Sequence, residues 1–210
     1  MSHRLHDKKV GDIMRLEEVA TVRTGAVTGR KKAEEGMQSS IRYKMLNLKC
    51  IAAEGYIDLG YAEEFRAKEK LKTELFTQEG DVLIRLSFPY TSVLIDDKYC
   101  GLLVPSHFAI VRANRNKVLP EYILWFLRRE STYQQILQNS SGSTAFGTIS
   151  SGFIGSLDIR VLPMKKQQAL GQLLLLSNKE QELLYRLAKE KAVFNNEALN
   201  NIYDKFKGEN

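Results

Sequence analysis

The feature that most constrains this chain is a long, uninterrupted helical pattern at its C-terminal end. From Met164 onward the composition shifts to Leu, Gln, Lys, Glu and Asn, with no Pro or Gly between Gly171 and Gly208. Apolar side chains recur there every three or four residues, which predicts one apolar stripe along a helix. Over about 40 residues such a helix would be about 60 Å long and would outreach the preceding domain. We expect the stripe to pack against another helix through Leu173, Leu176, Leu184, Leu187, Phe194, Ala198 and Ile202.

Two points about this pattern stay open from the sequence. Ser177 and Glu180 have the spacing of a capping box, so the pattern fits either one helix or two. An exposed apolar stripe is normally covered by another helix, and Glu180 and Lys191 within it would then help to set the register. The alternative is a stripe that folds back on its own domain.

The first half of the chain has the pattern of a β-rich domain. Short apolar or alternating runs, separated by turn residues, predict strands within 16–25, 41–53, 80–87, 91–96 and 107–113. Closely spaced short strands favour a curled or barrel-like sheet. A helix is expected over 119–138, where Pro120 stands at the expected first helical position and Ile123, Phe126 and Leu127 follow at helical spacing. One more strand is expected over 157–163.

An uncharged run, NSSGSTAFGTISSGFIG, lies between this helix and the last strand. Small hydroxyl residues and glycines bury little apolar area, but they bring many N–H and O–H donors to a surface. The run is therefore either a linker or a loop that faces a ligand.

The overall composition is that of a folded, moderately basic protein. The 210 residues are 43% hydrophobic and 27% charged, with a formal net charge of +6 and a pI near 9.2. This charge favours polyanions such as nucleic acid without requiring them. No window reaches the roughly 18 apolar residues of a membrane span and no signal-peptide core is present, so we expect a cytoplasmic location and no membrane contact.

Motifs that would indicate an enzyme are incomplete. SFPY at 87–90 resembles the motif with which amino-methyltransferases hold a flipped base, but Phe88 replaces a proline and no methyl-donor loop accompanies it. GSTAFGTI at 142–149 has phosphate-loop spacing, but Thr148 stands where Lys is required. Cys50, Cys100 and three scattered histidines lack the spacing of a metal site. We therefore expect no catalytic residues, metal or cofactor.

The densest positive cluster is RTGAVTGRKK at 23–32, followed by Arg42 and Lys44 on the next expected strand. Arg and Lys on a glycine-containing loop suit contacts to phosphates, which position a protein on DNA. A solvated loop is the alternative. The second loop, rich in hydroxyl groups, adds weight to nucleic-acid binding.

The order of these motifs resembles the specificity subunit of type I restriction-modification systems. The matching segments are LEEVATVRTG, GDVLI, YILWFLRR, GSTAFGTI and the start of the long helix, LPMKKQQ, so the resemblance covers about residues 16 to 206. Two positions depart from the family pattern, Met164 in place of a second proline and Gln167 in place of an acidic residue.

The resemblance implies a non-catalytic protein that binds a specific sequence of double-stranded DNA and directs a separate methyltransferase subunit. Family members commonly carry two recognition modules, and this chain has room for one, which makes it resemble a half-size subunit. Two copies should then pair through the long helices as a homodimer on a symmetric, interrupted site. Pairing with a different half-subunit and the presence of a restriction subunit both stay open.

We therefore expect an α/β (α+β) fold, with a curled mixed β-sheet and flanking helices in a DNA-recognition domain at 1–162, and a coiled-coil-like helical spacer at 163–210. A structural coiled-coil adaptor with an incidental basic face is the alternative function, and RNA-binding is a third that lacks exposed aromatic pairs on a strand. Arg85 is the candidate for base reading. The other expected DNA-binding residues are Arg23, Thr24, Arg30, Lys31, Lys32, Arg42, Ser141, Ser143, Thr144, Phe146 and Thr148.

Overall fold

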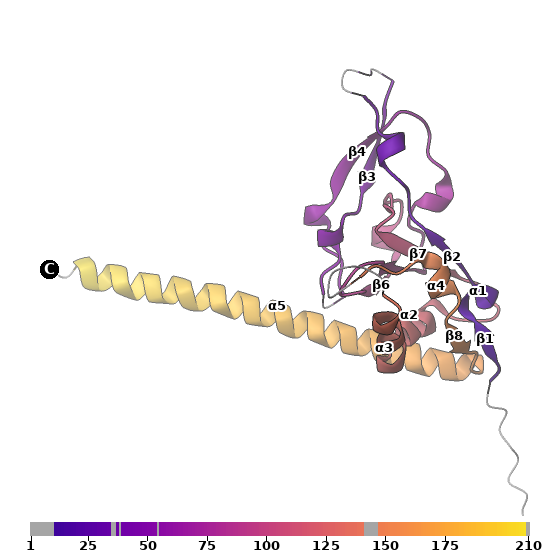
Figure 1. Ribbon diagram of the computed structural model, residues 1–210. Helices are drawn as coiled ribbons and strands as arrows, with labels where there is room; N and C mark the ends of the chain where they lie inside the picture. The colour runs from indigo at the N-terminus through magenta and orange to yellow at the C-terminus, as the bar shows by residue number, and fades with distance from the viewer. Residues whose placement is uncertain (1–10, 35–36, 38, 54, 141–146, 209–210) are drawn as a thin grey trace, which may run out of the picture. The chain divides into compact units, whose positions relative to one another are not determined.

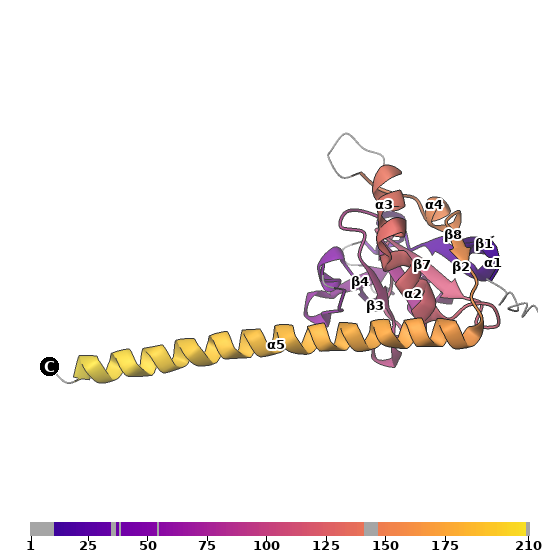
Figure 2. The same ribbon diagram turned by 90° about the horizontal axis from the view of Figure 1, so that it is seen from below.

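A computed structural model describes residues 11–34, 37, 39–53, 55–140 and 147–208. The chain divides into two compact units, Met1–Gln172 and Leu173–Asn210. The first unit combines strands with short helices, and the second is helical (Figures 1 and 2). The expected α+β class with a long C-terminal helix is confirmed.

The core of the first unit is a four-stranded sheet in the order β2-β7-β5-β6, antiparallel at every step. Both faces of its central part are buried, which explains why β5 shows a continuous apolar run, Val82 to Ile84, rather than an alternation. The strands are β2 (Ala20–Thr24), β5 (Asp81–Arg85), β6 (Ser92–Leu94) and β7 (Phe108–Ala113).

Different segments cover the two faces of this sheet. Leu83 and Ile110 point into a cluster formed with the chain that follows β3 (Ile41–Met45), including Leu46 and Ile51. Helices α2 (Pro120–Arg128) and α4 (Ser151–Gly155) contact the strands on the other side, where α4 lies against β2 (Figure 2). Because both faces are covered by elements of the same unit, this sheet offers its strand ends and turns, not a face, to a ligand.

Two further sheets have two strands each. β3 (Ile41–Met45) pairs antiparallel with β4 (Glu63–Ala67), and β1 (Ile13–Arg15) pairs antiparallel with β8 (Asp158–Arg160). β4 was not predicted. None of the three sheets among the described residues closes on itself, so the barrel-like alternative is wrong.

Two of the expected strands are shorter than predicted. Leu16–Val19 forms the helical turn α1, because Leu16 and Val19 are both buried at a spacing of three and the Glu18 carboxylate accepts from the Arg15 backbone N–H at 2.7 Å. The strand at 41–53 ends at Met45, since Asn47 caps a 3-10 turn by accepting from the Lys49 and Cys50 N–H groups.

The helix expected over 119–138 is broken into α2 (Pro120–Arg128) and α3 (Glu130–Gln138). Arg129 is extended, with ψ at 134°, and separates the two. The break has a packing reason: α2 is buried on most sides, whereas α3 buries only Thr132 and Ile136, so the two segments need different orientations. A short helix, α4 (Ser151–Gly155), follows and is capped by the Ser150 hydroxyl, which accepts from the Phe153 N–H at 3.0 Å.

The long helix α5 spans Met164–Gly208 without interruption, so the structure has one helix and the Ser177 capping box is not used. Its first part lies within the first unit, where the Gln167 side chain is 1% exposed and makes three hydrogen bonds. Its amide oxygen accepts from the Leu119 N–H at 2.9 Å, and its amide nitrogen donates to the Lys117 and Leu162 carbonyls at 3.1 and 2.7 Å.

Gly171 allows α5 to approach α2 closely. A Cβ atom at this position would lie 2.6 Å from the Glu121 Cβ, too close for any side chain without a shift. Beyond it, the side chains of the second unit are mostly exposed. No helix within the described ranges is long and apolar enough to cross a membrane.

Candidate nucleic-acid interface

Three of the cations expected to bind phosphate are paired with carboxylates. Arg23, on β2, lies 3.2 Å from the Glu74 carboxylate, and Lys31 lies 3.7 Å from that of Glu69. Arg42, on β3, lies 3.7 Å from Glu64. Partly or fully exposed pairs of this kind contribute little stability and are screened by salt, so a phosphate group can replace the carboxylate at small cost.

Arg30 and Lys32 lie in a surface depression together with Lys68, which was not among the predicted DNA-binding residues. Among the described residues that line this depression, Glu34 is the one with a carboxylate. No ion pair involves Arg30, Lys32 or Lys68 in the part of the chain that the structure describes. We call this surface the basic depression; it is lined by Gly29, Arg30, Lys32, Glu34, Met37 and Lys68.

Backbone pairing explains how Lys68 reaches this place. Lys32 forms an antiparallel bridge with Ala67, and the Lys68 N–H donates to the Lys31 carbonyl at 3.1 Å. The segment at 31–33 thus extends along the edge of β4 that β3 leaves free. This pairing joins residues 35 positions apart, and no local periodicity in the sequence indicates it.

The hydroxyl-rich run is described only at its two ends. Ser141, Ser143, Thr144 and Phe146 lie outside the described residues, so their assignment to DNA stays a prediction. At the near end, the Ser140 hydroxyl donates to the Leu137 carbonyl at 2.8 Å.

The far end of this run is fastened to the turn between β5 and β6. Thr148 is exposed and bridges Ser87, and the Ile149 N–H donates to the Leu86 carbonyl at 2.9 Å. The Tyr90 hydroxyl donates to the Gly147 carbonyl at 2.6 Å. These contacts hold the end of the run on the edge of the central sheet.

The beginning of the first loop meets the end of the second. Thr24 closes β2, and its hydroxyl oxygen lies 2.7 Å from that of Ser151 at the start of α4. Thr24 therefore lies against Ser151, three residues after Thr148 in the chain. Arg30, in the basic depression, and Arg42, on β3, belong instead to the β3–β4 part of the domain.

Arg85 ends β5 beside the same turn. One guanidinium nitrogen donates to the Phe88 carbonyl at 3.2 Å, but the buried Nε atom has no hydrogen-bond partner among the described residues. Burial lowers the pKa of the Arg85 guanidinium. A buried donor without an acceptor is unfavourable, and a ligand acceptor such as a base edge or phosphate would relieve it.

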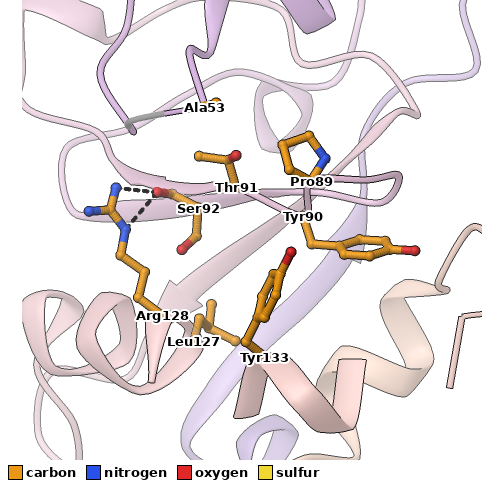
Figure 3. A pocket seen from close by; sticks show the side chains of 8 residues that line it. All are labelled: Ala53, Pro89, Tyr90, Thr91, Ser92, Leu127, Arg128 and Tyr133. Atoms are coloured by element: carbon orange, nitrogen blue, oxygen red, sulfur yellow. Dashed lines mark hydrogen bonds between the residues drawn. The ribbon is translucent and has the colours of Figure 1, made fainter. Parts of the chain in front are cut away.

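The turn at 87–90 is the SFPY motif, and its tyrosine has a structural role. Tyr90 is 3% exposed and lines a cavity of about 290 Å³ with Tyr133 and Leu127 (Figure 3). Its hydroxyl is engaged by Gly147, so the ring is not placed to stack on a flipped base. Phe88 is the exposed aromatic of the motif, at 41%, and its ring meets the Tyr90 ring edge-on at 6.2 Å.

Arg128 also lines this cavity, with its charge directed at backbone carbonyls. It donates to the Ser92 carbonyl through two nitrogens, at 3.1 and 2.6 Å, and to the Gly55 carbonyl at 3.2 Å (Figure 3). Burial lowers the pKa of its guanidinium. These bonds tie α2 to β6, so Arg128 is a structural arginine. No group of three His, Cys, Asp or Glu side chains that could hold a metal occurs in the described ranges.

The apolar stripe of the second unit is exposed along its length. Leu173 and Leu176 are 66% and 70% exposed, and Leu183 joins Leu184 and Leu187 in lining one shallow depression. Leu183 was not among the predicted contacts, although it lies seven residues after Leu176. Of the other predicted stripe residues, Phe194 and Ile202 are exposed and Ala198 is partly buried.

Comparison with known proteins places this fold among subunits of one kind of system. No family model and no curated protein matches the sequence. The HsdS subunit from Thermoanaerobacter tengcongensis matches 90% of this chain with 47% of its own length, at 15% identity and a TM-score of 0.62. A structure from work on assembly and conformational transition of the type I R-M system matches 88% of this chain with 47% of its own, at 16% identity and a TM-score of 0.64.

A third structure, the type I restriction-modification system S subunit from M. genitalium, matches 88% of this chain with 43% of its own, at 12% identity and a TM-score of 0.53. The family resemblance found in the sequence is thus confirmed at the level of the fold. The chain spans about half the length of these structures.

Proposed function

We propose that this protein recognises a specific sequence of double-stranded DNA and directs a separate DNA methyltransferase subunit of a type I restriction-modification system to it. The observation that carries the proposal is the likeness of fold, which extends over 88–90% of this chain. The basic depression, and the Arg85 Nε that has no partner among the described residues, support it with groups suited to DNA binding.

The recognition domain would be residues 1–162 and the spacer residues 163–210. Hydroxyl groups of the 139–149 run would contact DNA, with Phe146 stacking on a base or wedging between bases, and Arg85 would read a base edge. The phosphate contacts would come from Arg23, Arg30, Lys31, Lys32 and Arg42, and Thr24 would also lie at the DNA. The protein would transfer no methyl group itself and would need no cofactor.

The test is a salt titration of DNA binding. A duplex selected from a randomised pool should bind with a log affinity that falls by about 0.9 per phosphate neutralised for each decade of salt. Binding of the selected duplex should exceed that of a scrambled one. A chain that binds no duplex at any salt concentration, yet associates through its helix, would instead be a coiled-coil adaptor. The exposed leucines of α5 would form the contact in that case too.

Two copies would pair through α5 and place two recognition domains on a symmetric site, with the methyltransferase subunit, and a restriction subunit where one exists, bound to that assembly. The exposed apolar stripe supports this part of the proposal, because single helices rarely leave such a face uncovered.

The replacement of Leu184 and Leu187 by Glu should yield monomers in light scattering. Lys189→Glu with Asn196→Glu, on the opposite face of the same helix, should leave the dimer intact. Equal masses for the two double variants would contradict pairing through this stripe.

Catalysis should be absent from the purified chain. Incubated with S-adenosylmethionine and the selected duplex, the protein alone should leave the DNA unmethylated, and methylation should appear only when the methyltransferase subunit is added. Methylated DNA in the first mixture would contradict the assignment of a non-catalytic role.

A further inference from the structure

The β3–β4 pair has one buried face and one charged face. On the inner face, Phe65 and Ala67 are buried in a cluster with Leu71 and Leu103. On the outer face, all side chains are exposed and charged, three as cations and one as a carboxylate. We call this surface the outer ribbon face; it consists of Arg42, Lys44, Glu64 and Arg66.

The register of the pair sets two like charges side by side. Arg42 stands directly opposite Arg66, and Lys44 stands directly opposite Glu64. Side chains opposite one another on a sheet have Cβ atoms about 4.5–5.5 Å apart, and like charges at this separation destabilise the pair. The Arg42 contact with Glu64, at 3.7 Å on an exposed surface, offsets this repulsion only in part. A pair that weakens its own sheet points to a role outside folding.

The outer ribbon face and the basic depression are neighbours along the chain. Lys68 lines the depression and lies two residues after Arg66, one residue beyond the end of β4. Arg30 and Lys32 reach the same depression because the 31–33 segment pairs with the other edge of β4. Figure 1 shows β3 and β4 side by side, away from β1, β8 and α2. Basic side chains thus occupy both the outer ribbon face and the depression at the edge of β4.

We propose that the outer ribbon face and the basic depression together bind the backbone of a DNA strand, and we call the two surfaces together the saddle. Arg42 and Arg66 would contact phosphates together, and Lys68 would extend the contact into the basic depression. The inference rests on the proposed function, and it adds Arg66 and Lys68 to the DNA-binding residues. A phosphate between Arg42 and Arg66 would convert their mutual repulsion into two attractive contacts.

The setting of these arginines favours phosphates over base edges as their partners. Both side chains are exposed, and the Arg66 Nε donates a long hydrogen bond to the Ser40 hydroxyl at 3.2 Å. Base reading needs side chains fixed by neighbouring groups, whereas phosphate contacts tolerate some freedom. Sequence preference should therefore arise elsewhere in the domain, and this surface should contribute affinity to every duplex.

The experiment compares the salt dependence of duplex binding by the full-length protein and by Arg42→Ala with Arg66→Ala. The double variant should lower the slope of log affinity against log salt by about 1.8, two phosphate contacts at about 0.9 each. Between 50 and 200 mM salt, the wild type should then lose about tenfold more affinity than the variant. The ratio of affinities for selected and scrambled duplexes should stay the same. Arg42→Lys with Arg66→Lys should keep the wild-type slope, because the charges remain.

The matched control is Lys98→Ala with Lys189→Ala, which removes two exposed cations outside this surface and should leave the slope unchanged. A wild-type slope that the Arg42 and Arg66 alanine variant retains would overturn the inference and leave the proposed function intact. A loss of sequence preference in that variant would assign the arginines to base reading and overturn it as well. Wild-type protein that shows no salt-dependent binding would contradict the proposed function itself.

Discussion

Two cross-strand pairs of the same domain show opposite electrostatic arrangements. In the central sheet the fully buried Asp81 stands directly opposite Arg112. The Asp81 carboxylate accepts two hydrogen bonds from the Arg112 guanidinium, at 2.7 and 2.8 Å. In the β3–β4 ribbon Arg42 stands directly opposite Arg66, and both are exposed. The first pair satisfies its own charges within the fold. The second pair sets two like charges side by side, and only Arg42 has a carboxylate, that of Glu64, within 4 Å among the described residues. We infer that the first pair serves stability and, if the proposal holds, the second serves binding.

The largest effect should come from the buried pair. Asp81→Ala removes the partner of Arg112 and also the acceptor of the Gln78 N–H, 2.8 Å from the carboxylate. We expect the free energy of unfolding to fall by about 3 kcal/mol, since a partly buried charge loses its counter-ion. Urea denaturation followed by circular dichroism measures this change.

Arg42→Ala is the control for Asp81→Ala, because it also removes one member of a cross-strand pair. It should change the free energy of unfolding by less than about 0.5 kcal/mol. Similar losses from the two substitutions would show that the ribbon pair is as structural as the buried one.

The second effect concerns the buried start of α5, where Gln167 departs from the acidic residue of the family pattern. Its amide donates two hydrogen bonds to carbonyls, which an ionised carboxylate is unable to do. Gln167→Glu should therefore cost about 2–3 kcal/mol of unfolding free energy. The exposed neighbour provides the control: Gln168→Glu should have almost no effect in the same denaturation experiment. A stable Gln167→Glu protein would mean that the start of the helix rearranges to admit the charge.

A third comparison sets two partly buried arginines, Arg85 and Arg128, against each other. The Arg85 Nε has no hydrogen-bond partner among the described residues, whereas Arg128 bonds to the Ser92 and Gly55 carbonyls. Arg85→Met should leave the free energy of unfolding unchanged or slightly higher, but should reduce discrimination between the selected and scrambled duplexes by about 1–3 kcal/mol.

Arg128→Met should do the reverse and lower stability, because the carbonyls of buried Ser92 and partly buried Gly55 lose their donor. Competition binding and urea denaturation of both variants separate the two outcomes. Retained sequence preference in Arg85→Met would remove Arg85 from the candidates for base reading.

The parts of the fold that were predicted correctly carry their signal within a few residues. The apolar runs at β5 and β7 predicted those strands, and the helical pattern after Met164 predicted helix there while leaving open whether one helix or two formed. β4 was missed because Phe65 and Ala67 are its only apolar positions, between charged neighbours, and its strand is completed by pairing with residues 18 or more positions away. The break at Arg129 was missed because helical periodicity continues on both sides of it.

The candidate site shows the same division. Local composition identified the cations at 23–32 and the hydroxyl-rich run, but it gave no sign that Lys68 joins Arg30 and Lys32, since that depends on the bridge between Lys32 and Ala67. The like-charge pair of Arg42 and Arg66 exists only in one register of β3 on β4, and a shift of one residue would remove it.

The smallest expected effect tests that pair most directly. Arg66→Thr places a residue suited to strands opposite Arg42 and removes the repulsion, so the free energy of unfolding should rise by about 0.2–1 kcal/mol and the melting temperature by about 1–3 °C. The same variant should lower the salt slope of duplex binding by about 0.9. Lys44→Thr is the matched control in the same ribbon, because Lys44 faces Glu64 and its loss should lower stability slightly. Changes of opposite sign in the free energy of unfolding, together with the lower salt slope of Arg66→Thr, would support one pair that serves folding and one that serves DNA binding. A loss of stability in both variants would make Arg66 a structural residue and would contradict the proposed saddle.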